Sequence, residues 1–449
     1  MPTAHPRVLA IAILCFLAPV IAPSVTRAAD ATRRPAMRPA MRDFMGLNTH
    51  TVGFRPDLYA PVCRNLRDYH PFDWDVGNDT SAATKFPMTV NGVSWEELYG
   101  NWTKKGYNID SCIMFDGRPS DSWHEPAKDA RVYGEAFARF FGPSGKHPWV
   151  TSVEIGNEPA KYSTEKYREI FQAMASGVRV GDPKMKIATC AVMTGKPDQW
   201  SKPMAAIDGL GELFDVVNIH SYAFKDGWPT WHRSYPEDPS IRHLKDIEDV
   251  IQYRNAHFQG KQFWLTEFGY DAASHPPDPK GEWSKWAGVT DEQQAEYIVR
   301  SFLVFSAMDI DRAYLYFFDD KDQAQLHGAS GITRNYKPKP SFYAMSYLYK
   351  TLGDYHFVKA VSKKEGDLYC YEYAKAAPSK ERAYVAWLAN GDSKWEMRSV
   401  HLGQEPREVY KIARMPMTND PEVPQVEVKR EGDGVDVSVG PAPVFILAR

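Results

Sequence analysis

The sequence predicts an α/β fold: a (β/α)₈ TIM barrel followed by a small antiparallel β-domain. The first observation is an alternation of short apolar runs and amphipathic helical stretches from residue 43 to residue 353. The second is that these runs number eight, which is the strand count of such a barrel. The third is that helical periodicity ends after residue 353. An open doubly wound sheet is the alternative, but no G-x-G-x-x-G motif follows the first strand.

The first element is an apolar run at the N-terminus. Arg7 precedes the stretch LAIAILCFLAPVIA, and small residues follow it in SVTRAAD. This order is typical of a secretory signal peptide. We expect residues 1–28 to be a cleaved signal peptide and the protein to be secreted or periplasmic. A membrane anchor is less favoured because the run is short and Pro19 interrupts it, so we expect no membrane partner after cleavage.

Residues 29–42 are expected to form a flexible leader. They contain the basic near-repeat ATRRPAMRPAMR, which has no periodic apolar face. Its prolines also remove backbone hydrogen-bond donors.

The barrel is expected over residues 43–353. Its strands are predicted from runs of strand length that are mostly enriched in β-branched or aromatic residues. These runs lie at residues 43–49, 62–67, 107–115, 149–155, 186–193, 214–222, 261–268 and 312–318. Amphipathic helices are expected at residues 129–141, 165–180, 241–258, 291–308 and 339–353. Thr290 is a favourable start for the fourth of these helices, and Gly353 a stop for the last.

The C-terminal domain is expected over residues 354–449. The segments DLYCYEYA, RAYVAWLAN, EMRSVHLG and VDVSVGPAPVFILA are short and alternate apolar with polar residues. Turn residues such as Asn390-Gly391-Asp392 separate them. This pattern predicts a small antiparallel, sandwich-like β-domain.

Charge and cysteine content exclude several classes of protein. The chain has 54 Lys and Arg against 57 Asp and Glu, without the basic excess of a nucleic-acid-binding protein. The cysteines beyond the expected signal peptide have neither a C-x-x-C pair nor zinc spacing. They are Cys63, Cys112, Cys190 and Cys370. We expect them to be buried small side chains, with a Cys63–Cys112 bridge left open.

Two glutamates occupy the ends of predicted barrel strands. Glu158 follows the fourth run in TSVEIGNEP, and Glu267 ends the seventh in FWLTEFG. Strand C-termini meet at the active-site face of this fold, where the fourth and seventh strands lie opposite each other. Two opposed carboxylates are what glycosidic cleavage requires. The alternative is structural: Glu158 would cap a helix and Glu267 would form a salt bridge within the barrel.

At these residues the chain resembles the clan A glycoside hydrolases, retaining β-glycosidases on (β/α)₈ barrels, and in particular family 39-like and family 5-like members. The resemblance covers most of residues 43–353, and the trailing β-domain resembles that of family 39-like members. It implies that Glu158 is the acid/base and Glu267 the nucleophile. Their carboxyl groups would then lie about 5–5.5 Å apart, and the anomeric configuration would be retained.

The resemblance also implies supporting roles. Asn157 would hydrogen-bond the sugar 2-hydroxyl. Within VVNIHSYAF, Tyr222 would hydrogen-bond the nucleophile and His220 would line the subsite. Arg67 in NLRDYH would lie beside Glu267 and keep it ionised, since a nearby cation favours the charged form.

Other residues are candidates from their placement. His50 ends the first strand and would contact sugar or pack in the core. Asp116 ends the third strand and would bind a hydroxyl or cap its loop. Glu154 lies deeper than Glu158, so we expect it to pair with a buried cation. Residues 319–322 lack the spacing of a calcium loop and are expected to form a solvated turn. No metal or organic cofactor is expected.

Aromatic residues are the expected walls of the sugar site. Relatives commonly carry Trp where this chain has Gly156 and Phe317-Phe318. Flat aromatic faces suit pyranose rings, although such side chains also anchor loops. Tryptophans of the predicted βα loops are Trp74, Trp123, Trp228, Trp231, Trp283 and Trp286.

Together these features predict a secreted retaining glycoside hydrolase that cleaves β-glycosidic bonds of oligo- or polysaccharides. A carbohydrate is the expected partner. The alternatives are a non-catalytic carbohydrate-binding barrel and a transglycosylase that uses the same glycosyl–enzyme intermediate.

Overall fold

The computed structural model describes residues 37–193, 201–391, 394–402, 408–420, 424–431 and 434–449. The expected signal peptide, residues 1–28, and the leader up to residue 36 lie outside the described residues. Among the described residues, no helix combines the length and apolar character that crossing a bilayer requires.

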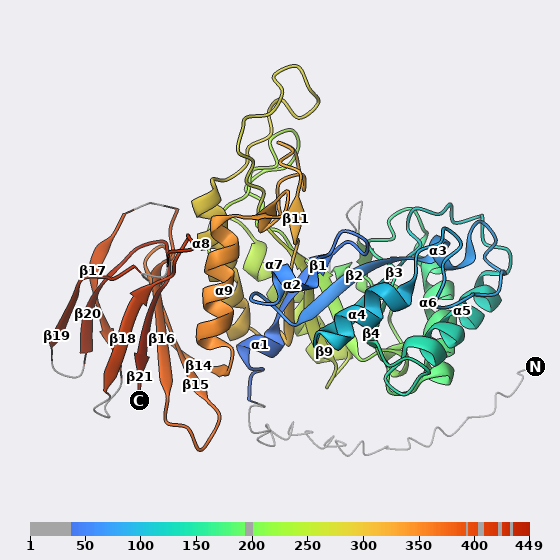
Figure 1. Ribbon diagram of the computed structural model, residues 1–449, viewed down its shortest axis with the longest axis horizontal. Coiled ribbons are helices and arrows are strands. Elements are labelled where there is room, and N and C mark those ends of the chain that lie inside the picture. Colours follow the sequence, from blue (N-terminus) through green and yellow to red (C-terminus); the bar gives the residue numbers. More distant parts are fainter. Residues whose placement is uncertain (1–36, 194–200, 392–393, 403–407, 421–423, 432–433) are drawn as a thin grey trace, which may run out of the picture. The chain divides into compact units, whose positions relative to one another are not determined.

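The centre of the fold is a closed barrel of parallel strands (Figure 1). In order around the barrel, its strands are β1 (Met45–Thr49), β10 (Arg312–Leu315), β9 (Gln262–Phe268), β8 (Val216–His220), β5 (Lys186–Ala188), β4 (Val150–Ile155), β3 (Asn108–Met114) and β2 (Asn65–Pro71). Each predicted apolar run contributes one of these strands, so the predicted fold class is confirmed. The predicted bounds of the second run, residues 62–67, were displaced, because β2 begins at Asn65 and continues through the polar residues Asp68 and His70.

Long helices cover the outside of the barrel. They are α5 (Pro126–Phe141), α6 (Thr164–Gly181), α7 (His243–His257), α8 (Asp291–Ala307) and α9 (Pro340–Leu352). Helices α5 and α6 pack side by side (Figure 1). All five were predicted to within a few residues. Thr290 and Gln293 form a capping box at the start of α8, which satisfies otherwise unpaired backbone donors. Gly353 ends α9 in a right-handed conformation.

Shorter elements form the remaining connections of the barrel. The helical ones are α1 (Met41–Phe44), α2 (Pro56–Tyr59), α3 (Phe72–Val76), η1 (Glu96–Gly100), α4 (Asn101–Lys104), η2 (Met204–Ala206) and η3 (Gly211–Leu213). The extended ones are β6 (Val192–Met193), β7 (Lys202–Pro203), β11 (Asp319–Asp320), β12 (Thr333–Arg334) and β13 (Lys337–Pro338).

The segment just before β1 differs from the expected flexible leader. Arg38 forms a 2.7 Å ion pair with Asp309, and the backbone N–H of Arg42 donates to the carbonyl of Gly353. Met41, within α1, is buried. Residues 38–42 therefore pack against the barrel, and the side chain of Met41 belongs to its hydrophobic core.

The C-terminal domain consists of two antiparallel sheets. The larger has the order β14 (Tyr355–Lys363), β15 (Leu368–Lys375), β16 (Arg382–Leu388), β21 (Val444–Ala448) and β18 (Val409–Arg414). The smaller has the order β17 (Glu396–His401), β20 (Gly434–Val439) and β19 (Val428–Glu431). Val437 and Val439 of β20 share one hydrophobic core with Tyr384 and Ile446 of the larger sheet. The antiparallel, sandwich-like domain is thus confirmed.

A buried polar cluster joins this domain to the barrel. Arg300 of α8 forms a 2.6 Å ion pair with Glu237, and Nε1 of Trp387 on β16 donates to the same carboxylate at 2.7 Å. Arg300 also donates to the carbonyl of Asn390. Loss of any one partner would leave a desolvated polar group in this cluster, which is destabilising.

The four described cysteines are Cys63, Cys112, Cys190 and Cys370, and each is a buried free thiol. This is the expected role of buried small side chains. The Cys63–Cys112 bridge that the sequence left open is not formed.

Candidate active site

Two strand ends position the paired carboxylates. Glu267 is the second-last residue of β9, whereas Glu158 follows the end of β4 at Ile155. The chain leaves β4 through Gly156, whose φ of 87° favours glycine, and Glu158 itself has a φ of 38°. Backbone strain at a non-glycine residue typically marks a functional position. After this turn the carboxylate of Glu158 contacts the ring of His220, the last residue of β8.

The two carboxylates converge, as the sequence predicted. One oxygen each of Glu158 and Glu267 and one ring nitrogen of His220 all lie within 4.8 Å of one another. Nδ1 of His220 is 2.6 Å from Oε1 of Glu158 and 3.5 Å from Oε2 of Glu267. The side chain of Glu158 is 26% exposed and that of Glu267 only 8%. The two acids therefore occupy different environments.

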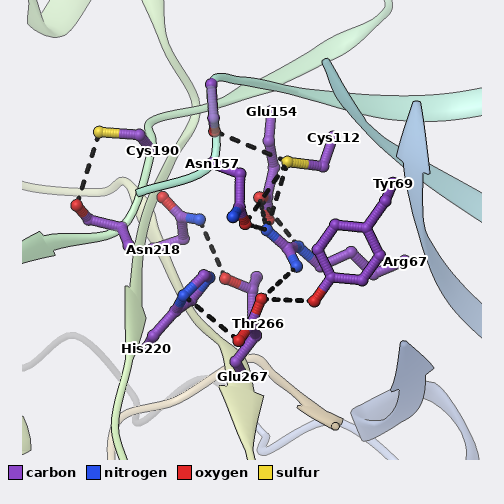
Figure 2. A network of polar contacts seen from close by, with 12 residues as sticks. Arg67, Tyr69, Cys112, Glu154, Asn157, Cys190, Asn218, His220, Thr266 and Glu267 are labelled. Atoms are coloured by element: carbon purple, nitrogen blue, oxygen red, sulfur yellow. Dashed lines mark hydrogen bonds and ion pairs between the residues drawn. The ribbon is translucent and has the colours of Figure 1, made fainter. Parts of the chain in front are cut away.

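Glu267 accepts hydrogen bonds from Arg67 and Tyr69, which Figure 2 shows, and from Tyr222. Nη1 of Arg67 and the hydroxyl of Tyr69 donate to Oε1 at 2.9 and 2.5 Å. The hydroxyl of Tyr222 donates to Oε2 at 2.8 Å. Burial by itself raises the pKa of Glu267, but the charges of His220 and Arg67 and the two tyrosine hydrogen bonds outweigh it and lower that pKa to about 2. Glu267 is therefore held as a carboxylate.

A second set of contacts fixes Arg67 (Figure 2). Nε and Nη2 both donate to Oε2 of Glu154, at 2.9 and 2.7 Å. Nη1 also donates to Asn48 at 2.9 Å, and Nη2 donates to Asn157 at 2.8 Å. The thiol of Cys112 is 3.3 Å from Nη2. Glu154 is the buried partner of a cation, as expected, and it orients the guanidinium toward Glu267.

His220 lies between the two carboxylates. Burial lowers the pKa of its ring, but the nearby charges of Glu267 and Glu158 and the hydrogen bond to Glu158 raise it by more, so the net shift is upward. The His220 side chain is 3% exposed. His220 therefore lines the site and also interacts electrostatically with both carboxylates.

Two cavities meet at this centre. One, of about 510 Å³, is lined by Glu267 and Asn157 and walled by His50, Trp74 and Tyr316. The other, of about 500 Å³, is lined by His220, Tyr222, Phe224, Ile247, Val250 and Leu326. Glu158 and His327 line both cavities. Each volume lies in the range of small-molecule sites.

His50 and Asp116, two of the predicted site residues, differ in whether they line a cavity. The exposed ring of His50 stacks on Tyr69 with centroids 5.2 Å apart, and it lines the first cavity. Asp116 lines neither cavity and instead accepts the backbone N–H of Asn157 at 3.0 Å, so it caps the loop. Burial is the main cause that raises the pKa of Asp116 to about 7.

The expected solvated turn at residues 319–322 was wrong for its first two residues, whereas Lys321 is exposed. Asp319 and Asp320 are 5% and 2% exposed. Asp320 pairs with buried Lys339 at 3.3 Å, and Asp319 accepts a hydrogen bond from Thr333. Asp319 and Asp320 form β11, which pairs with β12, so Thr333 of β12 and Lys339 satisfy carboxylates that the sequence alone left to solvent.

The aromatic walls differ in part from those expected. Trp74 lines the first cavity, whereas Trp123 and Trp286 are buried. Just after the eighth strand Tyr316 lines the first cavity, while Phe317 and Phe318 are buried in the hydrophobic core.

Tyr69, Tyr316 and His327 line the first cavity and were not among the predicted site residues. Tyr69 could have been found, because it follows Arg67 by two residues and therefore shares its face of β2.

Glu158, His220 and Glu267 could also ligate a metal on distance alone. The contacts to Glu267 disfavour this use of the site. A guanidinium and two hydroxyls already donate to its oxygens, and a divalent cation would lie close to the charge of Arg67.

Comparison with known proteins finds solved structures with a similar fold. No model of a known protein family matches the sequence, and no curated protein matches it. A family 39 glycoside hydrolase from the gut symbiont Bacteroides cellulosilyticus WH2 has a TM-score of 0.67 at 13% identity, over 91% of this chain and 81% of that one. A glucosidase from Croceicoccus marinus has a TM-score of 0.64 at 13% identity, over 92% and 97%. A family 51 α-L-arabinofuranosidase from Bifidobacterium longum has a TM-score of 0.58 at 13% identity, over 94% and 98%.

Proposed function

We propose that the protein is a retaining glycoside hydrolase that cleaves β-glycosidic bonds of oligo- or polysaccharides. The observation that carries this proposal is the approach of Glu158 and Glu267, whose nearest described oxygens lie within 4.8 Å. Retaining enzymes hold their carboxyl groups about 5–5.5 Å apart, whereas inverting enzymes need about 6.5–9.5 Å to admit a water molecule. The glycoside hydrolases that share the fold support the same reaction class.

Glu267 is the nucleophile in this proposal. Arg67 and the tyrosine hydroxyls keep it ionised and oriented. Oε1 accepts two hydrogen bonds and Oε2 one, so Oε2 keeps more lone-pair capacity for attack on the anomeric carbon. The bond from that carbon to the leaving oxygen breaks as the glycosyl ester to Glu267 forms.

Glu158 is the acid/base. It protonates the departing glycosidic oxygen and then deprotonates the water that hydrolyses the ester. The 2.6 Å hydrogen bond to Nδ1 of His220 gives it a partner for the proton during this exchange. Its partial exposure, in contrast to Glu267, suits a group that must meet incoming water.

The positions of the cavities assign the two halves of the substrate. Glu267 lines only the cavity of about 510 Å³, so the sugar under attack belongs there, and the leaving group belongs beyond Glu158 in the other cavity. Asn157 uses its side-chain oxygen to accept from Arg67. Its amide NH₂ therefore remains to donate to the sugar 2-hydroxyl.

The test is covalent trapping. Incubation with 2-deoxy-2-fluoro β-glycosides, followed by proteolysis and mass spectrometry, should place one fluoroglycosyl group on the peptide that contains Glu267. Glu267→Gln should remain unlabelled, while Glu169→Gln, a change on the exposed surface of α6, should label normally. A non-catalytic carbohydrate-binding barrel would bind these compounds and acquire no label. A transglycosylase would acquire the label but release little free sugar when an acceptor is present.

Export is part of the proposal. Residues 1–28 have the sequence features of a cleaved signal peptide. N-terminal sequencing of protein recovered from the periplasm or medium should begin near residue 29. Recovery of the uncleaved chain in the cytoplasm alone would contradict export.

A further inference from the structure

His327 occupies a distinctive position in the site. It lies in the loop between β11 and β12 with a φ of 61°, a backbone conformation that side chains other than glycine rarely adopt. Together with Glu158 it lines both cavities. Because Glu158 would protonate the oxygen between the two halves of the substrate, a residue shared by both cavities lies beside the bond that is cleaved.

A buried arginine fixes the tautomer of His327. Nη2 of Arg233 is 3.4 Å from Nδ1 of the His327 ring. Arginine can only donate, so Nδ1 must accept and the ring proton must be on Nε2. Burial and then the charge of Arg233 lower the pKa of His327, so the ring is neutral. Arg233 is itself held by Asp271 at 3.0 Å.

The ring is also held between tyrosines. Its centroid lies 5.0 Å from that of Tyr222 and 5.3 Å from that of Tyr316, both edge-to-face. Tyr222 in turn donates to Glu267. Within the described part of the chain no hydrogen-bond partner reaches Nε2 of His327, although Nδ1 is satisfied. One oriented N–H donor therefore remains on a ring that faces the cavities.

We propose that His327 is a specificity-determining residue whose Nε2–H donates a hydrogen bond to a sugar hydroxyl or ring oxygen adjacent to the scissile bond. This inference rests on the proposed function and adds a substrate contact to it. The acceptor oxygen belongs either to the sugar attacked by Glu267 or to the leaving sugar. A leaving group without sugar oxygens distinguishes these two sources.

The test compares three variants on two kinds of probe. His327→Leu removes the donor. His327→Gln places an amide N–H near the position of Nε2, and His327→Asn places its amide near Nδ1. The probes are 4-nitrophenyl β-glycosides and unsubstituted β-1,4-linked disaccharides of glucose and xylose. Gln325→Leu is the matched control, because it changes the same loop at a residue that lines neither cavity.

We expect His327→Leu and His327→Asn to lower kcat/KM about tenfold, the scale of one lost hydrogen bond, and His327→Gln to stay within about threefold of wild type. Unfolding temperatures should match that of Gln325→Leu. A loss confined to the disaccharides assigns the contact to the leaving sugar, whereas a loss on both probes assigns it to the attacked sugar. Long-range ¹H–¹⁵N NMR should report the Nε2–H tautomer in the wild type and lose its fixed signature in Arg233→Gln.

Two results would overturn the inference with the proposed function intact: unchanged kcat/KM in His327→Leu, or an Nδ1–H tautomer in the wild type. Equal losses in all three variants, accompanied by lower unfolding temperatures, would indicate a structural role and overturn it as well. Failure of the wild type to hydrolyse any probe would instead refute the proposed function, on which the substrate contact depends.

Discussion

Nη1 of Arg67 lies 2.9 Å from Oε1 of Glu267, and the two side chains are 0% and 8% exposed. They come from β2 and β9, 200 residues apart in the sequence. Because water is nearly excluded, this ion pair influences the protonation of Glu267 far more than a surface pair would. The same guanidinium is anchored by Glu154 on its other edge.

Removal of the guanidinium should change the acid limb of the pH–activity profile. In Arg67→Met, Glu267 loses a cation that lowers its pKa, so the acid limb of kcat/KM should move upward by about one to three pH units. Arg67→Lys keeps the positive charge and should show a smaller displacement. In profiles recorded from pH 3 to pH 8, the wild type should keep its kcat/KM down to the acid end, whereas Arg67→Met should lose it within this range. An acid end in Arg67→Met that matches the wild type would contradict the role of Arg67.

Glu154 should contribute far more to stability than a surface carboxylate with a comparable contact. Glu154 and Arg67 are both fully buried at 2.7 Å, so Glu154→Gln leaves a buried cation short of a partner and should cost about 3–5 kcal/mol. Glu169 pairs with Lys166 at 2.8 Å on the surface, and Glu169→Gln should cost less than about 1 kcal/mol. Urea denaturation compares the two, and similar costs would refute the anchoring role of Glu154.

His220 should set the alkaline limb of activity. Glu267 and Glu158 raise its pKa against the effect of burial, so His220 keeps its ring proton above about pH 6.5, where an ordinary histidine loses it. We expect the alkaline limb of kcat/KM to lie above that value and to move downward in His220→Asn. An alkaline limb at the same pH in the variant would exclude His220 as the group that sets this limb.

Asp110 should make the protein less stable as pH rises. It is buried in the barrel, and neither of its oxygens has a partner among the described residues. Burial first and then the charge of Glu154 raise its pKa to about 8. Unfolded, an aspartate has a pKa of about 3.9. Between about pH 4 and pH 8 the folded protein therefore holds a proton that the unfolded chain has lost, and stability falls across that window.

Asp110→Asn should remove this contribution. Unfolding temperatures measured at pH 5 and pH 8 should differ less in the variant than in the wild type. Asp57→Asn, which changes an exposed carboxylate, should retain the wild-type slope. A slope for Asp110→Asn equal to that of the wild type would show that the carboxyl ionises freely in the folded state.

The eight barrel strands were predictable because strands buried on both faces are read as short apolar runs. The predicted bounds of β2 were displaced toward the N-terminus because the C-terminal half of this strand is polar. Asp68 and His70 are buried there with hydrogen-bond partners that include Tyr99 for both residues. Tyr99 lies about 30 residues further along the chain, so a local sequence pattern does not reveal it. The paired glutamates could be predicted because they lie at or just after the C-terminal ends of barrel strands.

Residues on loops were less predictable. The orientation of His327 depends on Arg233, 94 residues away. It also depends on a left-handed backbone conformation that no local sequence motif indicates. Asp116 was left between two roles because the choice depends on where the backbone N–H of Asn157 points. In both cases the deciding contact comes from a different strand or loop.

The most direct measurement of the central claim is the anomeric configuration of the first-formed product, followed by ¹H NMR during hydrolysis of a 4-nitrophenyl β-glycoside. Convergence of Glu158 and Glu267 within 4.8 Å leaves no room for a water molecule to attack from the opposite face. The β-anomer should appear first and mutarotate afterwards. Initial release of the α-anomer would contradict it.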